Sequence, residues 1–370
     1  MSILSEKVEI LFNSINIISS KSLYIFPSIK EELLCELNLD SNTEFYDYNA
    51  PLFKELKNLV DKYLTGCDLI YLNLADEIQA IAYQSNENDK VICIYRGTVN
   101  AIWNLCYQYC FDYDFYYTNS KKYAKTMNKK ETHIYLFNYL VKLSLMFVIL
   151  HEVGHLKLGH ILKIRNITGG SLLLEFPKNL KENNTSTDTI ELQKLEIEAD
   201  IFAAQKFINM LDELVSSVNK KILGGVGYIE AINFIIFSIS IILIHWQVIS
   251  RQTGYDQDHP ISLERLLAIV TVIGLELYKN PKIMNVYTEY IKNNIDIRNF
   301  LESDLKSDLD LDSKKMMDVF DNNENIHHSG LGRILGLQTM IMIKSICEIQ
   351  GVTMPQILAA QLNLLNKLGF

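Results

Sequence analysis

The strongest constraint on the fold of this chain is one long apolar run, residues 134–164, which includes LSLMFVILHEVGH. The run has helical character and is apolar on nearly every side. A helix of that kind is buried rather than half-exposed. The sequence therefore predicts a helix through the centre of the domain. That helix carries His151, Glu152 and His155 near its C-terminal end.

The segment HEVGH, residues 151–155, has the pattern HExxH. Residues four apart lie on one face of a helix, so His151 and His155 can direct their imidazole nitrogens at one metal ion. Glu152 lies one step round the helix, where it can reach a water molecule on the metal. Nitrogen and oxygen donors suit zinc. Gly154 would let another backbone come close to the helix. The motif alone arises by chance in roughly one sequence per hundred of this composition.

A catalytic zinc site takes three protein ligands and leaves one position open. Glu196 is the candidate third ligand, and Asp200 lies four residues later on the same predicted helix. Asp200 can accept a hydrogen bond from a ligating imidazole and so fix its tautomer. The alternative is that this segment, LEIEAD, is the acidic solvated face of a surface helix.

Two further histidines need interpretation. His160 follows His151 by nine residues, which places it on the opposite side of a continuous helix. We therefore expect a structural or surface role for His160, and a ligand role only if the helix ends near Gly159. His259 and Arg265 belong to the segment DHPISLER, ahead of and within a predicted helix.

The sequence has 370 residues and a formal net charge of −9, without a long basic run. Nucleic acid is therefore an unexpected partner, because phosphate binding needs clustered Lys and Arg. Six dispersed cysteines are typical of reduced thiols, and the N-terminus lacks a basic leader. We expect a cytoplasmic protein. The apolar segment 231–248 is interrupted by polar residues, which favours a buried helix over a membrane span.

The predicted architecture is α+β and mostly α-helical. Residues 1–65 form a helical region with a helix over Ala50–Leu64. Ile78–Tyr83 and Lys90–Arg96 form a β-hairpin, followed by a helix over Asn100–Tyr117. The metallopeptidase domain is predicted at 66–280. A C-terminal helical region is predicted at 281–370.

Three elements, HEVGH at 151–155, EIEAD at 196–200 and HPISLER at 259–265, occur in a set order. This order resembles that of the gluzincin metallopeptidases of the HtpX and CAAX-prenyl-protease type, over roughly residues 70–280. Gln79-Ala80 stands where that family has Asn-Ala in its first strand. The segments HEVGHLKLGH and EADIFAA also resemble the soluble ImmA-type peptidases. A mid-sequence HExxH in a chain of this kind is similar, too, to the phage-exclusion peptidase Lit.

The resemblance implies a zincin-like core with a small β-hairpin and a buried HExxH helix. It implies that the zinc ligands are His151, His155 and Glu196, and that the catalytic base is Glu152. By the same resemblance Asp200 would support a ligand, Arg265 would tie helices together, and His259 would be a transition-state donor or a gating ligand. These seven assignments are expectations.

The expected function is that of a zinc-dependent endopeptidase, which cleaves a protein or peptide substrate. A regulated peptidase or a phage-defence peptidase fits this expectation. We expect the strand VICIYR to pair with an extended substrate by strand addition. One alternative is a latent zinc-binding protein that acts as an interaction module. Another is a membrane-associated processing peptidase. The sequence leaves the substrate, the oligomeric state and the role of 281–370 open.

Overall fold

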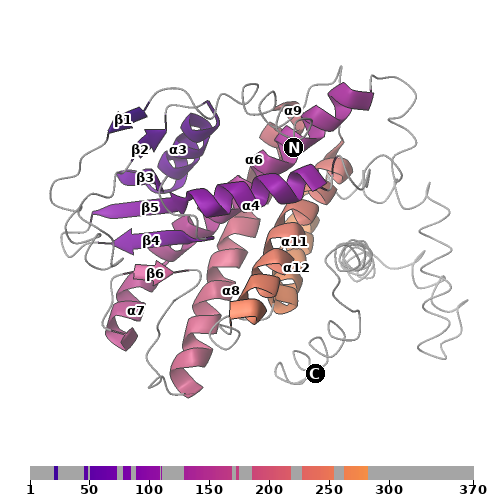
Figure 1. The fold of residues 1–370 in the computed structure, drawn as a ribbon. Helices are drawn as coiled ribbons and strands as arrows, with labels where there is room; N and C mark the ends of the chain where they lie inside the picture. Colours follow the sequence, from indigo (N-terminus) through magenta and orange to yellow (C-terminus); the bar gives the residue numbers. More distant parts are fainter. Residues whose placement is uncertain are drawn as a thin grey trace, which may run out of the picture.

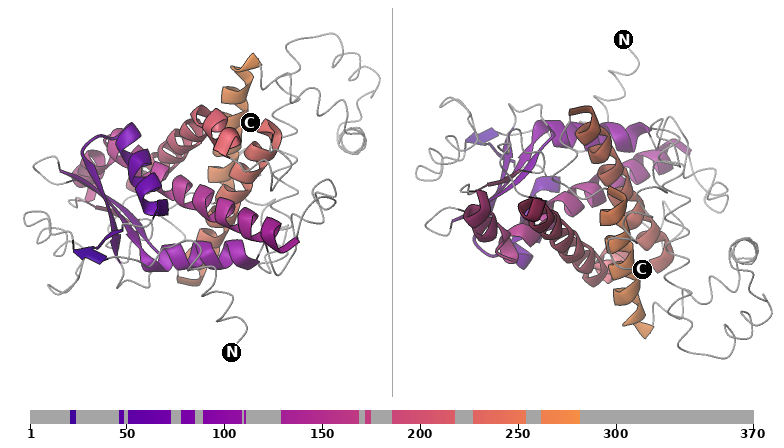
Figure 2. Two further views of the ribbon diagram at one scale, coloured as in Figure 1. Left: turned by 90° about the horizontal axis from the view of Figure 1, so that it is seen from above. Right: turned by 90° about the horizontal axis from the view of Figure 1, so that it is seen from below.

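The computed structural model describes residues 21–23, 46–48, 51–72, 78–84, 89–108, 110, 129–168, 172–174, 186–217, 227–253 and 262–281. These residues form a sheet and a group of helices that gather largely on one of its faces (Figures 1 and 2). One large apolar core joins sheet and helices. The predicted α+β, mostly helical fold is confirmed.

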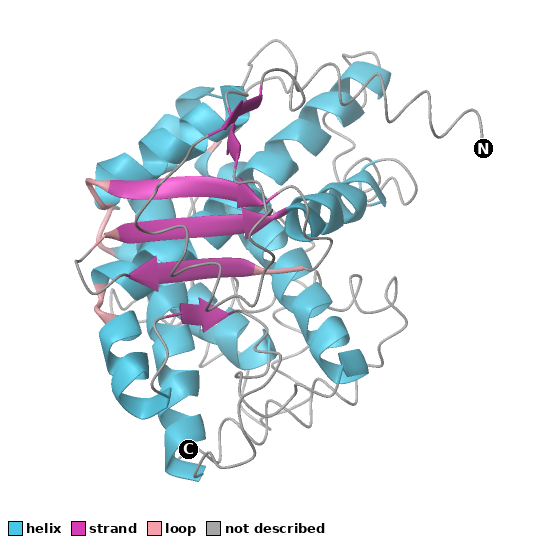
Figure 3. Cartoon of the chain, turned by 60° about the vertical axis from the view of Figure 1, so that its left-hand side comes forward, coloured by secondary structure: helices cyan, strands magenta, loops and turns pink. Residues whose placement is uncertain are grey.

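The sheet has the strand order β1-β2-β3-β5-β4-β6 and is seen face-on in Figure 3. Its strands are β1 (Lys21–Leu23), β2 (Tyr46–Tyr48), β3 (Cys67–Leu72), β4 (Ala80–Gln84), β5 (Lys90–Tyr95) and β6 (Leu172–Leu174). The hairpin expected from the sequence is present as the antiparallel pair β4 and β5. The N-terminal region expected to be helical contains two of these strands, β1 and β2.

The expectation that VICIYR accepts a substrate strand is wrong. This segment is β5, and each of its residues from Lys90 to Tyr95 is already in register with β3, which runs parallel to it. Its other edge pairs with β4 over Lys90–Ile94. A strand with a neighbour on both sides has no free row of backbone donors and acceptors to offer.

Two helices from the first half of the chain pack against both the sheet and the central helix. The first, α3 (Pro51–Tyr63), matches the helix expected at Ala50–Leu64. The helix α4 (Arg96–Tyr107) follows β5 without a loop, and buried Trp103 packs edge-on against Phe137. The central helix is α6 (Lys129–Lys157), in which every residue from 143 to 156 is buried. The buried helix predicted from the apolar run is therefore confirmed.

The central helix ends earlier than the apolar run does. Gly159 adopts φ 73°, a left-handed conformation that glycine takes at low cost, and a new helix, α7 (His160–Thr168), begins at the next residue. The continuous helix expected through His160 is therefore wrong. The chain turns after Leu158, and this turn changes where the imidazole of His160 lies.

The remaining helices are α8 (Ser186–Asn209), α9 (Leu211–Ser217), α11 (Tyr228–Thr253) and α12 (Ser262–Tyr278). Helix α8 packs against both α6 and α12, and α11 packs against α6 and α12 as well. Residues 234–243 of α11 are all buried, as expected for this apolar segment. These contacts place α8 between the helix that carries HEVGH and the helix that carries Arg265.

One helical stretch in the described residues, Tyr135–Lys157, is long and apolar enough to cross a membrane. In the structure 89% of its apolar window is buried inside the protein. The core helix of a soluble protein passes the same test of length and composition, so this stretch is weak evidence for a span. Ala231–Leu243 is a shorter apolar helix.

The predicted division at residues 65 and 280 stays a prediction. Residues 282–370, which hold nearly all of the predicted C-terminal helical region, lie outside the described residues.

The four described cysteines are buried free thiols, at positions Cys67, Cys93, Cys106 and Cys110.

Candidate metal centre

The helices α6 and α8 approach closely at Gly154. A Cβ atom added to Gly154 would lie 3.1 Å from the Cα and 3.2 Å from the carbonyl oxygen of Ala199. Real Cβ atoms rarely come this close to backbone, so glycine is what permits the approach. The glycine inside HEVGH therefore has the packing role that the sequence predicts, and it brings Glu196 of α8 toward the two histidines of α6.

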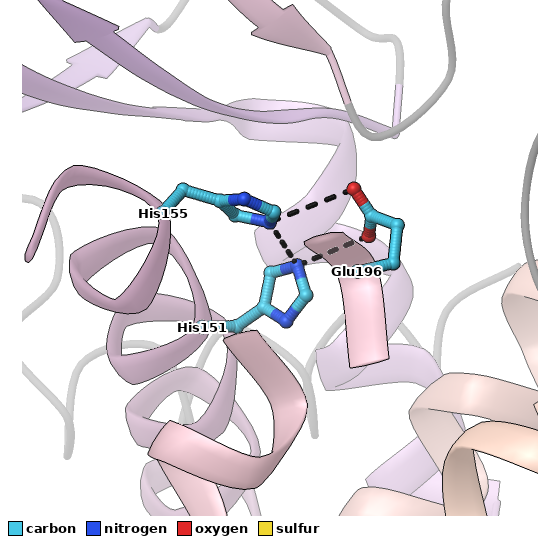
Figure 4. Close-up of side chains that lie close together, drawn as sticks. All are labelled: His151, His155 and Glu196. Atoms are coloured by element: carbon cyan, nitrogen blue, oxygen red, sulfur yellow. Dashed lines mark hydrogen bonds and ion pairs between the residues drawn. The ribbon is translucent and has the colours of Figure 1, made fainter. Parts of the chain in front are cut away.

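Three side chains meet at this crossing (Figure 4). The Nε2 atoms of His151 and His155 are 2.9 Å apart. Glu196 places one carboxylate oxygen 3.3 Å from His151 Nε2 and the other 3.5 Å from His155 Nε2. All three side chains are buried, with at most 2% of the surface of any of them exposed. This buried group can hold a metal ion.

Asp200 lies behind the first histidine. Its carboxylate accepts a hydrogen bond from His151 Nδ1 at 2.9 Å. Arg265 of α12 donates to both oxygens of Asp200, from Nε at 2.7 Å and from one terminal nitrogen at 3.0 Å. Because the hydrogen of a neutral His151 is on Nδ1, its Nε2 presents a lone pair to the group. Asp200 of α8 is thus joined to both His151 of α6 and Arg265 of α12.

The guanidinium of Arg265 also lies 5.6 Å from the ring centre of Trp246, on α11, and 3.8 Å from a carboxylate oxygen of Glu196. A planar cation that contacts an aromatic ring and two carboxylates can be buried at low cost. Sequence reasoning missed Trp246. A lone tryptophan in an apolar helix carries no signal for such a contact.

Burial dominates the electrostatics of His155. Removal from water lowers its pKa well below the usual value, and the negative charge of Glu196 opposes this effect only in part. His155 is therefore neutral at pH 7. A neutral imidazole is the form that binds metal ions.

Glu152 follows His151 on α6 and is 1% exposed. Its charge acts on the thiol of Cys93, in β5, whose pKa is raised mainly by burial and further by nearby Cys67 and Glu152. Glu152 is thus a buried carboxylate near β5, which packs against α6.

The remaining expectations have mixed outcomes. The alternative that LEIEAD is a solvated face is wrong, because Glu196 is 2% and Asp200 0% exposed. His160 is fully buried, and its Nδ1 lies 3.0 Å from Nδ1 of His155. A surface position for His160 is therefore excluded, and the group of described residues that could hold a metal is formed by His151, His155 and Glu196. His259 lies outside the described residues, so its role stays a prediction.

Comparison with known proteins adds one finding to this geometry. The family model described as Peptidase U49 matches residues 71–287, which are more than half of the chain and include β4 to α12. No curated protein and no solved structure matches the chain significantly. A peptidase acts on a protein or peptide substrate, so the match also gives the class of substrate. The chain belongs to the peptidase U49 family.

Proposed function

We propose that this peptidase is a zinc-dependent endopeptidase in which His151, His155 and Glu196 bind the metal and Glu152 is the general base. The observation that carries the proposal is the convergence of two Nε2 atoms and a carboxylate within 2.9–3.5 Å of one another, in a buried site. Two imidazole nitrogens and a carboxylate at this spacing form a donor set that one cation can bridge.

The donor set supports zinc in particular. Zinc binds histidine nitrogen and carboxylate oxygen at about 2.0–2.2 Å, so tetrahedral ligand atoms lie about 3.3 Å apart. The three separations measured here scatter around that value. Two histidines and one glutamate leave a fourth position, which a closed structural site would fill with another protein ligand. Among the described residues the metal-binding group has three members, which favours a catalytic site over a latent one.

A zinc ion bound at this position supplies Lewis acidity that makes water nucleophilic near neutral pH. With the metal bound, Glu152 would accept a proton from water and later donate it to the leaving amine. Its position in the chain, directly after His151 on α6, supports this assignment.

His259 is the candidate donor to the developing oxyanion. It precedes Arg265 by six residues, and Arg265 is fixed to Asp200 beside the site. This closeness in sequence supports the assignment to His259 of a role in the site. We also propose a cytoplasmic location, which the free thiols of the described cysteines support.

The Glu152→Gln variant tests the proposal. Glutamine keeps the shape of the side chain and cannot accept the proton, so we expect normal zinc content and a fall in turnover of about 10²–10⁴-fold. Zinc is measured by elemental analysis and turnover with a fluorescently labelled unfolded protein. Glu191→Gln, a carboxylate on α8 that is half-exposed, is the matched control. Wild-type turnover by Glu152→Gln would refute the role of the base.

The natural substrate requires a separate experiment. Protein termini are compared between cells that make the wild-type chain and cells that make Glu152→Gln at equal levels. New termini that occur only with the wild-type chain identify substrates and cleavage sites. Internal cleavage sites support an endopeptidase, and loss of one terminal residue at a time would point to an exopeptidase instead.

A further inference from the structure

His160 connects the candidate metal site to the protein surface. It is the first residue of α7, and the left-handed turn at Gly159 directs it back against α6. Its Nδ1 lies 3.0 Å from Nδ1 of His155, and its Nε2 lies 3.1 Å from a carboxylate oxygen of Glu198. The ring of His160 is fully buried, whereas the side chain of Glu198 is 36% exposed. His155, His160 and Glu198 thus form a continuous row of hydrogen-bonding groups.

The carboxylate of Glu198, at one end of this row, determines which atoms donate and which accept along it. A carboxylate only accepts, so Nε2 of His160 carries the hydrogen that Glu198 receives. A neutral His160 then has a bare Nδ1, which accepts the hydrogen on Nδ1 of His155. That assignment leaves Nε2 of His155 with a lone pair. This is the atom that faces His151 and Glu196.

We propose that His160 and Glu198 are positioning residues of the metal site, which hold His155 in the tautomer and orientation that bind the ion. The inference rests on the proposed zinc function. Each histidine of the site would then have its own carboxylate support. His151 contacts Asp200 directly, and His155 reaches Glu198 through His160.

The two supports differ in strength. Asp200 is fully buried and receives two hydrogen bonds from Arg265. Glu198 is partly exposed, and the ammonium of Lys163 lies 3.8 Å from its carboxylate. Water can replace a partly exposed carboxylate as the acceptor. We therefore expect the loss of Glu198 to weaken metal binding less than the loss of His160.

The geometry also separates a positioning role from a ligand role. His160 contacts Nδ1 of His155, on the side of the ring away from Nε2, whereas the donor group lies on the Nε2 side. His160 and the metal thus occupy opposite ends of one imidazole. Loss of His160 should lower the affinity for zinc without changing the atoms that bind it.

The test uses the full chain and the zinc affinity measured by competition with a chromophoric chelator. His160→Leu removes both hydrogen bonds and should weaken zinc binding about 10–100-fold. His160→Asn places an amide oxygen near the position of Nδ1 and should restore most of the affinity. Glu198→Gln should weaken binding a few-fold, and Glu191→Gln, its control on α8, should leave it unchanged.

A second measurement reports on the donor set. The visible spectrum of the Co²⁺-loaded protein should keep its band pattern in His160→Asn and His160→Leu, because the ligands are the same. If His160→Leu does not fold, His160→Asn and Glu198→Gln still test the inference through affinity and spectrum. A changed cobalt spectrum in His160→Asn would make His160 a ligand and overturn the inference.

The inference would also be overturned if His160→Leu bound zinc as tightly as the wild-type chain does. It would be overturned, too, if His160→Leu and His160→Asn lost zinc affinity equally. These results leave the proposed zinc function in place, because the wild-type chain still binds zinc. A wild-type chain that binds no zinc would refute the proposed function and, with it, this inference.

Discussion

Gly154 and Ala199 bring the two site helices into contact, with Cα of Ala199 3.1 Å from the position that a Cβ atom on Gly154 would occupy. Both partners at this contact are backbone, so neither can rotate away as a side chain could. His155 follows Gly154 by one residue, and Glu196 precedes Ala199 by three. The distance between His155 and Glu196 therefore depends on this close approach of the two helices.

The first prediction concerns Gly154→Ala. The added methyl group must separate α6 from α8, at a cost of about 1–3 kcal/mol that outweighs the better helix propensity of alanine, about 1 kcal/mol. We expect a lower free energy of unfolding in urea and weaker zinc binding, with larger losses in Gly154→Val. Gly66→Ala is the control, because Gly66 has φ 78° and open space around it. It should lose stability through strain and bind zinc normally. Normal zinc affinity in Gly154→Val would contradict the prediction.

The second prediction concerns the ligand on α8. Glu196→Ala removes the carboxylate that lies 3.3 Å and 3.5 Å from the two histidine nitrogens, so bound zinc should fall well below the wild-type level of about one per chain. Elemental analysis after gel filtration measures this content. Glu191→Ala, one helical turn and a half earlier on α8, should keep its zinc. Unchanged zinc in Glu196→Ala would show that Glu196 is not a ligand.

The parts of the site that the sequence predicts are those that depend on local helix geometry. His151 and His155 share a face because they are four residues apart in a helix, whatever the fold around it. Asp200 follows Glu196 by the same spacing of four residues. If Glu196 contacts the two histidines, Asp200 therefore lies near them as well. Residue spacing alone does not indicate that these two helices meet. The order of the three motifs does indicate it.

The parts that the sequence did not predict depend on a single backbone conformation or on distant pairing. One residue, Gly159, turns His160 from the far side of α6 onto His155. The parallel pairing of β3 with β5 joins segments separated by the whole of β4, and no local pattern encodes it. Trp246 reaches Arg265 only because α11 packs against α12.

The third prediction concerns the ion pair between Asp200 and Arg265. Both side chains are buried, so Arg265→Met or Asp200→Asn alone leaves a buried charge without its main partner and should destabilise the protein by about 3–5 kcal/mol. The double variant leaves neither charge and should be more stable than the sum of the two losses indicates. Urea unfolding of the four proteins gives this coupling. Additive losses would mean that the two side chains act independently.

The fourth prediction concerns the pH dependence of stability in the metal-free chain. Burial lowers the pKa of His155, His160 and His245 below the usual value of 6.5. Between those lowered values and 6.5 the unfolded chain binds protons that the folded chain does not, so stability rises with pH in that window and falls on acidification. Each histidine contributes at most about 1.4 kcal/mol per pH unit.

Urea unfolding at pH 7, 6 and 5 measures this slope, and most carboxylates stay ionised over that range. His245→Gln removes a titrating side chain that lies on α11, outside the metal-binding group, and should make the slope shallower without abolishing zinc binding. The contribution of His155 and His160 then remains. A metal-free chain whose stability is constant or rises from pH 7 to pH 5 would show that these histidines bind protons as readily when folded as when unfolded.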